Sequence, residues 1–197
     1  VGKTIAVQAA LAEAEPHTLV RIAASPSLSH AEFRERILSG FTPDACDSAT
    51  LARSADGIEA RLQAVRACGR MAFLVVDEAQ NLGLPLLEEL RVLSNLEADG
   101  HHLLQIILVG QPGLEEALSH PGCDALRQRI AIRCQLDSLS DAETEGYIRH
   151  RVLIAGGDSQ SLFTSESCQA VHRLAHGIPR EINLLAGEAL TLAHAAG

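Results

Sequence analysis

Three residues at the start of the chain have the types and order needed to bind the phosphates of a nucleotide. The sequence begins "VGKT", and Gly2, Lys3 and Thr4 match the end of the phosphate-binding loop G-x-x-x-x-G-K-[ST], whose first glycine would precede Val1. In such a loop, backbone amides and the lysine contact phosphate oxygens, and the threonine hydroxyl binds Mg²⁺. Because G-K-[ST] is expected by chance in about one chain in ten of this length, these residues alone are weak evidence.

A second group of residues, Asp77 and Glu78, directly follows the apolar run "FLVV". In a Walker B strand the aspartate helps to hold Mg²⁺ and the next glutamate can polarise a water molecule. The Thr4 hydroxyl, Asp77 and nucleotide phosphates would supply the hard oxygen ligands that Mg²⁺ prefers. A strand ending in surface acids is the alternative for Asp77 and Glu78 alone. Lys3 and Asp77 are 77 − 3 = 74 residues apart, which lets the chain return beside the loop, so together the two groups predict a site for ATP and Mg²⁺.

Helical and strand patterns alternate around these residues. Strands that alternate with helices indicate a parallel sheet in an α/β domain. The sequence therefore predicts a P-loop nucleoside triphosphatase fold. The expected helices are 5–15, 29–40, 57–69 and 85–100, the expected strands are 18–24, 71–77, 102–110 and a last one near Leu136, and residues 42–56 are expected to form a loop.

From Ser140 onward the strand patterns stop, and three helical segments follow. We therefore expect an ATPase core at residues 1–138 and a small all-helical lid domain at residues 139–197. His172 and His176 stand four apart on one predicted helix and could bind a metal, but no third ligand is near in sequence. A solvated or partly buried helix face is the simpler interpretation of this pair.

The bulk composition excludes several classes of protein. With 16 Lys and Arg against 25 Asp and Glu, the net charge of −9 argues against a broad basic surface for nucleic acid. No run approaches the roughly 20 apolar residues of a membrane span. Five cysteines without a C-x-x-C pair suggest neither a disulfide framework nor a zinc knuckle, and favour a reducing cytosol. These cysteines are Cys46, Cys68, Cys123, Cys134 and Cys168.

Beyond the two motifs, the sequence resembles the AAA+ ATPases across nearly its whole length. The segment "LLQIILVGQP" places Gln111 where the family has a polar sensor residue, more often Asn or Thr. The segment "LRQRI" offers Arg127 and Arg129 as the arginine that reaches a neighbouring subunit's nucleotide, and we prefer Arg129. The segment "GIPREINLL" matches the second-sensor motif, with Arg180 as its arginine. The resemblance implies ATP hydrolysis by a dimer or ring, with Glu78 orienting the attacking water.

Within that superfamily the sequence is most similar to the general secretion pathway protein A, or ExeA-type, ATPases. The segments that carry this likeness include "VVDEAQNL", "LEELRVLSNLE" and "GIPREINLLAGEAL", within residues 71–190. The likeness implies a cytoplasmic bacterial ATPase, at the cytoplasmic face of the inner membrane in the full-length protein, that works with a membrane-protein partner to place the outer-membrane secretin of type II secretion. An ATP-dependent regulator of DNA transposition is the alternative. A scaffold that binds no nucleotide is disfavoured because Asp77 and Glu78 are both present.

One further expectation concerns the sheet. In AAA+ proteins the strand before the phosphate-binding loop lies in the middle of the sheet, so a chain that starts at Val1 should lack this central strand. We therefore expect the strands around Val75 and Ile107 to face a gap. Since each buried unsatisfied backbone group costs about 1 to 3 kcal/mol, the 197-residue chain should fold poorly and bind ATP weakly.

Overall fold

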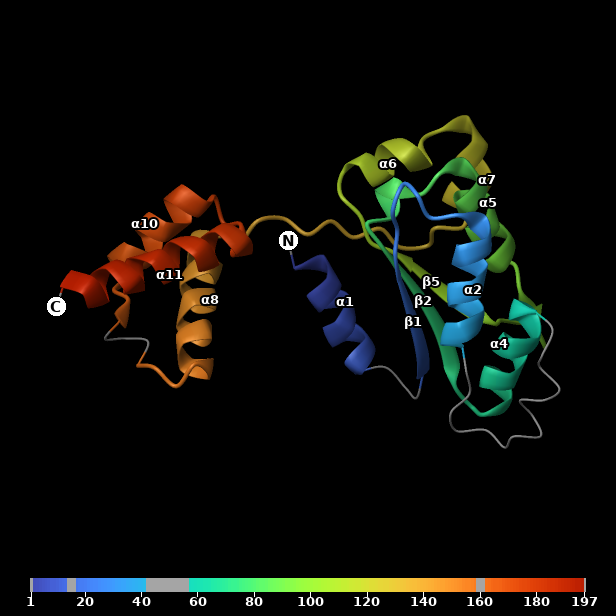
Figure 1. Ribbon diagram of the computed structural model, residues 1–197, viewed down its shortest axis with the longest axis horizontal. Coiled ribbons are helices and arrows are strands. Elements are labelled where there is room, and N and C mark those ends of the chain that lie inside the picture. Colours follow the sequence, from blue (N-terminus) through green and yellow to red (C-terminus); the bar gives the residue numbers. More distant parts are fainter. Residues whose placement is uncertain (1, 14–16, 42–56, 159–161, 197) are drawn as a thin grey trace. The chain divides into compact units, whose positions relative to one another are not determined.

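The computed structural model describes residues 2–13, 17–41, 57–158 and 162–196. They divide into two compact units: one is Thr4–Arg133, and the other is made of the residues from Cys134 onward, with which Gly2 and Lys3 are grouped (Figure 1). The first unit is an α/β layer structure and the second is helical. The loop expected at residues 42–56 lies outside the described residues.

Three parallel strands form the sheet of the first unit, in the order β1-β2-β5. These strands are β1 (His17–Ala23), β2 (Met71–Asp77) and β5 (Leu104–Leu108). The parallel sheet with flanking helices confirms the predicted fold class. The expectation that the strand around Val75 faces a gap is wrong, because Val75 pairs directly with Ile107 in the β2–β5 register. The central strand β2 therefore has hydrogen-bonded neighbours on both sides. The strand around Ile107, β5, is at the end of the described strand order and pairs there on one side only.

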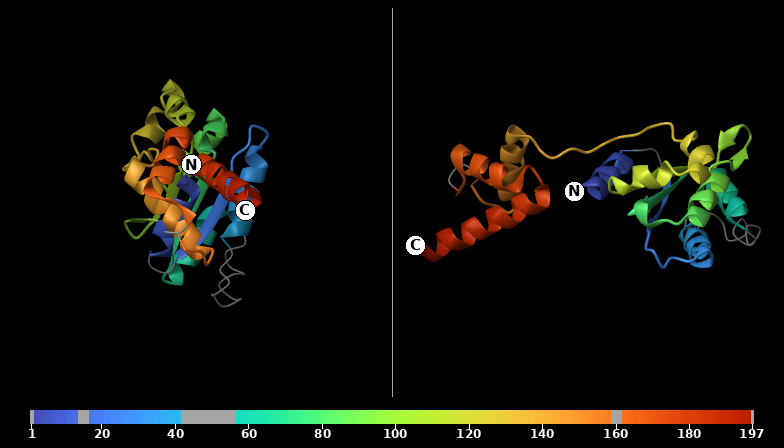
Figure 2. Two further views of the ribbon diagram at one scale, coloured as in Figure 1. Left: turned by 90° about the vertical axis from the view of Figure 1, so that its left-hand side faces the viewer. Right: turned by 90° about the horizontal axis from the view of Figure 1, so that it is seen from above.

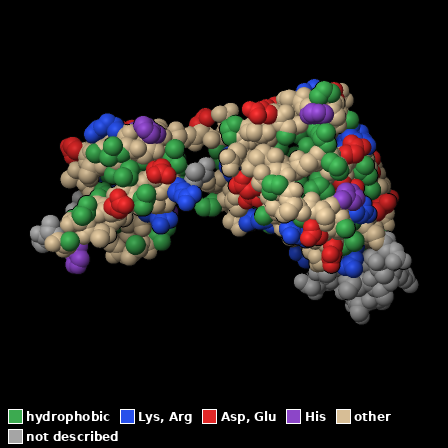
Figure 3. Space-filling model, turned by 45° about the horizontal axis from the view of Figure 1, so that its top comes forward, with side chains coloured by type: hydrophobic (Ala, Val, Ile, Leu, Met, Phe, Trp, Pro, Cys, Tyr) green, Lys and Arg blue, Asp and Glu red, His purple; other side chains and the backbone are tan. Residues whose placement is uncertain are grey.

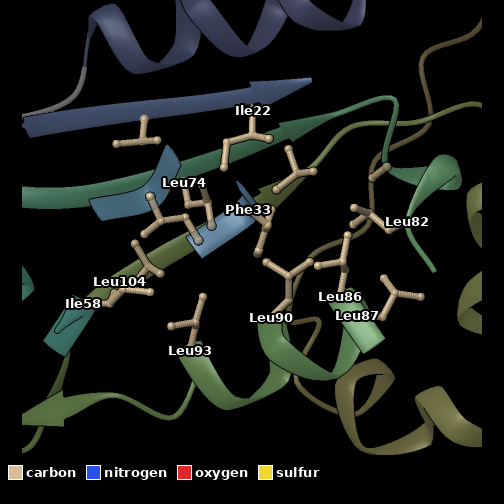
Figure 4. Close-up of a cluster of buried hydrophobic side chains, with 14 of the residues drawn as sticks. Ile22, Phe33, Ile58, Leu74, Leu82, Leu86, Leu87, Leu90, Leu93 and Leu104 are labelled. Carbon is tan, nitrogen blue, oxygen red and sulfur yellow. The ribbon is translucent and has the colours of Figure 1, made fainter. Parts of the chain in front are cut away.

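Helices cover both faces of this sheet. On one face, Leu11 of α1 (Lys3–Ala12) packs with Val75 and Val109, with Val7 at the margin. On the other face lie α2 (His30–Gly40), α4 (Ile58–Ala67) and α5 (Leu84–Leu93), as Figures 1 and 2 show. The main core is between the sheet and these three helices (Figure 4). Its labelled side chains are Ile22, Phe33, Ile58, Leu74, Leu82, Leu86, Leu87, Leu90, Leu93 and Leu104.

Local signals in the sequence fix the two ends of α2. Ser29 is the N-cap, and its side chain accepts the Glu32 amide while the Glu32 carboxylate accepts the Ser29 amide. This reciprocal pair is a capping box, which satisfies two otherwise unpaired donors. At the other end, a Cβ on Gly40 would lie 2.5 Å from a methyl group of Val20. Glycine therefore lets the end of α2 approach β1 closely.

The helix after β2 is shorter than the sequence pattern predicts. It ends at Leu93 rather than near residue 100, and a two-stranded antiparallel ladder follows, formed by β3 (Glu97–Ala98) and β4 (His101–His102). Asp99 and Gly100 between them both have positive φ, 52° and 73°. Asp-Gly is a strongly preferred pair for the two-residue turn of a hairpin, and this turn competes with continuation of the helix.

The strand predicted near Leu136 does not form. The segment after α6 (Gly113–Leu118), η2 (Pro121–Cys123) and α7 (Asp124–Arg127) has no regular secondary structure from residue 130 to residue 139. Ile132 is 84% exposed in this segment. A strand needs a neighbour that accepts and donates backbone hydrogen bonds, and within the described residues no strand pairs with this segment.

The described part of the second unit contains the three helices that the sequence predicts. They are α8 (Asp141–Ile154), α10 (Ser165–Ala175) and α11 (Pro179–Ala196). Their shared core contains Ile148, Val152, Phe163, Cys168, Val171, Ala175 and Ile182. Ser140 caps α8, and its hydrogen bonds to Glu143 hold the pKa of that carboxyl below its usual value. This structure is a helical lid of the kind expected after the core.

The turn between α10 and α11 depends on a glycine. Gly177 has φ of 70°, and a Cβ there would lie 2.0 Å from the Leu139 carbonyl oxygen. The Leu139 amide donates to the Gly177 carbonyl at 2.8 Å. The segment that leads into α8 is therefore held against the turn that starts α11, and a side chain at residue 177 would separate them.

The structure also bears on the cysteines, on membrane spans and on the distribution of charge. Cys68 is disulfide-bonded, which the cysteine pattern in the sequence did not predict. Cys123, Cys134 and Cys168 are free. Among the helices in the described ranges, none is both long and apolar enough to cross a membrane. On the face drawn in Figure 3, basic side chains are scattered among acidic ones and do not gather into one broad patch.

Candidate functional site

The candidate site lies at the carboxyl edge of the sheet, where β2 delivers Asp77 and Glu78. Backbone hydrogen bonds beyond the regular ladder hold this edge together. The Ala24 amide donates to the Asp77 carbonyl at 2.8 Å, and the Ala79 amide donates to the Val109 carbonyl at 2.8 Å. In open α/β sheets, ligands bind outside the carboxyl ends of the strands. The backbone of the Asp77–Glu78 pair is thus fixed from both neighbouring strands.

The structure brings the two predicted motifs together at Thr4 and Asp77. The Thr4 hydroxyl donates to Asp77 Oδ2 over 2.6 Å, and both residues are half-buried. An O–H···O⁻ bond of this length is a strong, charge-assisted one. The other Asp77 oxygen, Oδ1, accepts the Glu78 amide at 2.9 Å. A hydroxyl and a carboxylate 73 residues apart in sequence therefore form one cluster of oxygen ligands.

Gly2 and Lys3 directly precede Thr4 in the chain, at the start of α1. Gly2 has φ of 92°, where side chains are strained, and a Cβ there would meet no atom within 4 Å. Lys3 is half-buried and is the first residue of α1. The first amides of a helix lack intrahelical acceptors and attract anions. The arrangement suits phosphate oxygens beside a cation held by Thr4 and Asp77.

Glu78 has an unusual backbone and two amide partners. Its φ of 52° is in the left-handed region, which non-glycine residues adopt infrequently. The side chain is exposed, yet Glu78 Oε2 accepts from Gln80 Nε2 at 2.5 Å and from Gln111 Nε2 at 3.2 Å. The structure thus brings the predicted sensor residue Gln111 into contact with Glu78. Strained conformations that the surroundings enforce are common at functional sites.

Gln80 is a site residue that sequence reasoning missed. It stands two residues after Glu78 in "DEAQ", within a segment that carries the family likeness. Besides its bond to Glu78, its Oε1 accepts the Gln111 backbone amide at 3.1 Å. The short 3-10 helix η1 (Ala79–Asn81) after β2 turns Gln80 back toward β5. A long amide side chain within one turn of the two acids was the signal available in the sequence.

The two candidate trans-acting arginines lie at the end of α7. Arg127 forms an ion pair with Asp124 at 2.7 Å. Arg129 donates through Nε to Asn95 Oδ1 at 2.7 Å and through a terminal nitrogen to the Ala125 carbonyl at 3.0 Å. The described contacts join neither arginine to Glu78. Arg127 is neutralised by its own neighbour, whereas Arg129 is held only by neutral groups and keeps its net charge available.

Arg180 is in the second unit, as the second residue of α11, and is exposed. Among the described residues, no acidic side chain forms an ion pair with it. The histidine pair considered for metal binding has no third ligand within the described ranges. His172 Nδ1 is hydrogen-bonded to Thr144 Oγ1 at 2.9 Å, and the described ranges contain no group of three or more His, Cys, Asp or Glu placed to hold a metal.

Comparison with known proteins relates this site to a family. A family model described as "AAA domain" matches residues 1–118. General secretion pathway protein A of Aeromonas hydrophila is 38% identical over 196 residues, which is 100% of this chain and 36% of that protein. The chain therefore spans about a third of the length of this relative.

A solved structure supports the same fold. The crystal structure of Cdc6p from Pyrobaculum aerophilum matches with a TM-score of 0.64 and 14% sequence identity, over 99% of this chain and 54% of that one. At this identity the likeness concerns the fold alone. With the matching family model over more than half of its length, the chain belongs to the AAA domain family of ATPases.

Proposed function

We propose that the chain binds ATP with Mg²⁺ and hydrolyses the ATP to ADP and phosphate. The observation that carries this proposal is the hydrogen bond from Thr4 to Asp77 directly beside Glu78. A phosphate-binding helix start, two hard oxygen ligands and a carboxylate able to polarise water are the parts that phosphoryl transfer to water requires. The membership of the AAA domain family supports the same chemistry.

Each residue of the site has a distinct role in this proposal. Lys3 and the first amides of α1 bind phosphate oxygens, and the open space beside Gly2 leaves room for them. Thr4 and Asp77 fit Mg²⁺, which when bound neutralises charge that develops on the phosphates. Glu78 orients the attacking water, and Gln111 contacts Glu78 from the end of β5.

We further propose that Arg129 acts in trans in a dimer or ring, while Arg180 relates the helical lid to the nucleotide. The absence of a carboxylate partner for Arg129 among its described contacts supports this choice over Arg127, whose charge Asp124 neutralises. An arginine needs a free charge to stabilise the transition state of a neighbouring subunit. The division into a core of residues 1–138 and a lid of residues 139–197 belongs to the same proposal.

The cellular role that we propose is assembly of a bacterial secretion system with a membrane-protein partner, at the cytoplasmic face of the inner membrane. The support is the likeness to general secretion pathway protein A over the whole chain. Placement of a secretin is the specific task that the resemblance suggests. The net charge of −9 and the dispersed basic side chains on the face in Figure 3 favour this role over binding to DNA.

The experiment that tests hydrolysis is Glu78→Gln in the natural full-length protein. The substitution keeps the size of the side chain and removes its ability to accept a proton from water. We expect ATP affinity to be retained and turnover to fall at least about a hundredfold, since general acid and base groups contribute about 10² to 10⁴. An equal loss of binding and turnover would assign Glu78 a structural role. Hydrolysis stimulated by DNA with a steep salt dependence would contradict the secretion role.

A further inference from the structure

We propose that Gln80 is a positioning residue that fixes the Glu78 carboxylate for the attack of water. The inference rests on the proposed hydrolysis and assigns a role to a residue outside both sequence motifs. Gln80 contacts Glu78 with one end of its amide and the Gln111 backbone with the other, at 2.5 and 3.1 Å. The amide therefore links the end of β2 to the end of β5.

The direction of the Gln80 amide is determined by its two partners. The Gln111 backbone N–H can only donate, so it faces Gln80 Oε1. An ionised carboxylate can only accept, so Glu78 faces Gln80 Nε2. Turning the amide over would lose both hydrogen bonds at once. Gln80 is thus locked in the orientation that presents a donor to Glu78.

The space around the amide is fitted to this contact. A Cβ on Gly110 would lie 2.9 Å from Gln80 Oε1 and 2.9 Å from a methyl group of Leu114. Glycine at residue 110 therefore allows the Gln80 amide to reach the Gln111 N–H. Gln80 is half-buried, whereas Glu78 and the Gln111 side chain are exposed. The partly shielded Gln80 can restrain an exposed carboxylate that would otherwise sample several rotamers.

The hydrogen bonds leave one carboxylate oxygen available. Gln80 and Gln111 both donate to Oε2 of Glu78. Among the described residues, no donor reaches Oε1 of Glu78. The two amides hold one oxygen while the other can accept a proton from water. A general base must be within hydrogen-bond reach of that proton, so a fixed carboxylate favours the reaction.

Two substitutions and one control test this role in the natural full-length protein. Gln80→Glu keeps the length of the side chain and an acceptor for the Gln111 N–H, but it replaces the donor with a second carboxylate. Gln80→Leu removes both hydrogen bonds. Gln63→Leu is the matched control, because Gln63 Nε2 donates to Glu59 Oε1 at 3.3 Å on the exposed face of α4, away from the site.

We expect both Gln80 variants to lower kcat by about tenfold to a hundredfold, because a shift of about 1 Å in a reacting group can cost about a hundredfold. The ATP dissociation constant and the thermal melting temperature of Gln80→Glu should stay near those of the wild type. In a Glu78→Gln background, Gln80→Leu should lower kcat no further, since Gln80 acts only through Glu78. Gln63→Leu should change neither kcat nor ATP affinity.

Three results would overturn the inference. A kcat for both Gln80 variants within twofold of the wild type would show that Glu78 needs no anchor, and a raised kcat would show that Gln80 restrains an inactive state. A further large loss on adding Gln80→Leu to Glu78→Gln would assign Gln80 a structural role. Glu78→Gln alone separates the two proposals. If Glu78→Gln abolishes turnover while the Gln80 variants keep wild-type turnover, the proposed hydrolysis is supported and the proposed role of Gln80 is wrong. If Glu78→Gln turns over normally, both fall.

Discussion

The bond between Thr4 and Asp77 makes a quantitative prediction for Thr4→Val. Valine keeps the shape of the side chain and removes the hydroxyl that donates to Asp77 Oδ2 at 2.6 Å. A hydrogen bond to a charged group contributes about 1.5 to 3 kcal/mol. Both residues are half-buried, and Asp77 keeps the Glu78 amide on its other oxygen, so we expect the low end. Thr4→Val should therefore cost the first unit about 1.5 kcal/mol of unfolding free energy.

The assay must report on the first unit separately. The chain has no tryptophan, and its one tyrosine, Tyr147, is in the helical second unit, so intrinsic fluorescence would follow the wrong part. Amide hydrogen exchange at the buried residues Leu74 and Val75 of β2 reports opening of the first unit. Thr4→Val, Asp77→Asn and the double variant then form a thermodynamic cycle. Thr18→Val in β1 is the matched control, since its hydroxyl has no hydrogen-bond partner among the described residues.

The thermodynamic cycle measures the interaction free energy between Thr4 and Asp77. We expect an interaction free energy of at least about 1 kcal/mol between Thr4 and Asp77, and a change within about 0.5 kcal/mol for Thr18→Val. An interaction free energy below about 0.3 kcal/mol would mean that the two residues are independent. The start of α1 and the end of β2 would then not share one site in solution.

Two further predictions concern assembly and the helical lid. A mixture of Arg129→Ala and Lys3→Ala subunits should regain ATPase activity that each variant lacks, because one protein supplies the intact pocket and the other the arginine. Arg127→Ala is the control and should keep its activity. A mixture that never recovers activity would exclude action of Arg129 in trans. Gly177→Ala should destabilise the second unit by more than about 1 kcal/mol, since the new Cβ would lie 2.0 Å from the Leu139 carbonyl oxygen at a φ of 70°; an unchanged thermal transition followed by Tyr147 fluorescence would contradict this.

Much of the fold could be predicted because its signals are local. The types and spacing of Ser29 and Glu32 predict the start of α2, and Pro179 predicts the start of α11. The apolar run before Asp77 is long enough to identify a buried strand. Where local signals compete, the prediction was wrong. Leucines on a helical repeat predicted a helix to residue 100, but Asp99 and Gly100 form a turn that hydrophobic periodicity does not predict.

Other features depend on contacts that sequence spacing does not determine. The direct pairing of Val75 with Ile107 follows from the order of strands in the sheet. The sequence predicted a different order, in which a missing central strand left a gap beside the strand around Val75. Gln80 gains its place only because η1 turns it toward Gln111. The bond from Arg129 to Asn95 joins residues 34 apart in two different elements. Such side-chain partners become visible only when the elements are packed.

Calorimetric titration with ATP tests whether Thr4 and Asp77 hold Mg²⁺ beside bound nucleotide. In the natural full-length protein we expect ATP to bind tightly with Mg²⁺ present and at least about tenfold more weakly after chelation, because Mg²⁺ held by Thr4 and Asp77 would offset the charge of the phosphates. Asp77→Asn should abolish this difference while weak binding without Mg²⁺ persists. Equal affinity with and without Mg²⁺ in the wild type, or an Asp77→Asn variant that keeps the full Mg²⁺ dependence, would contradict the account.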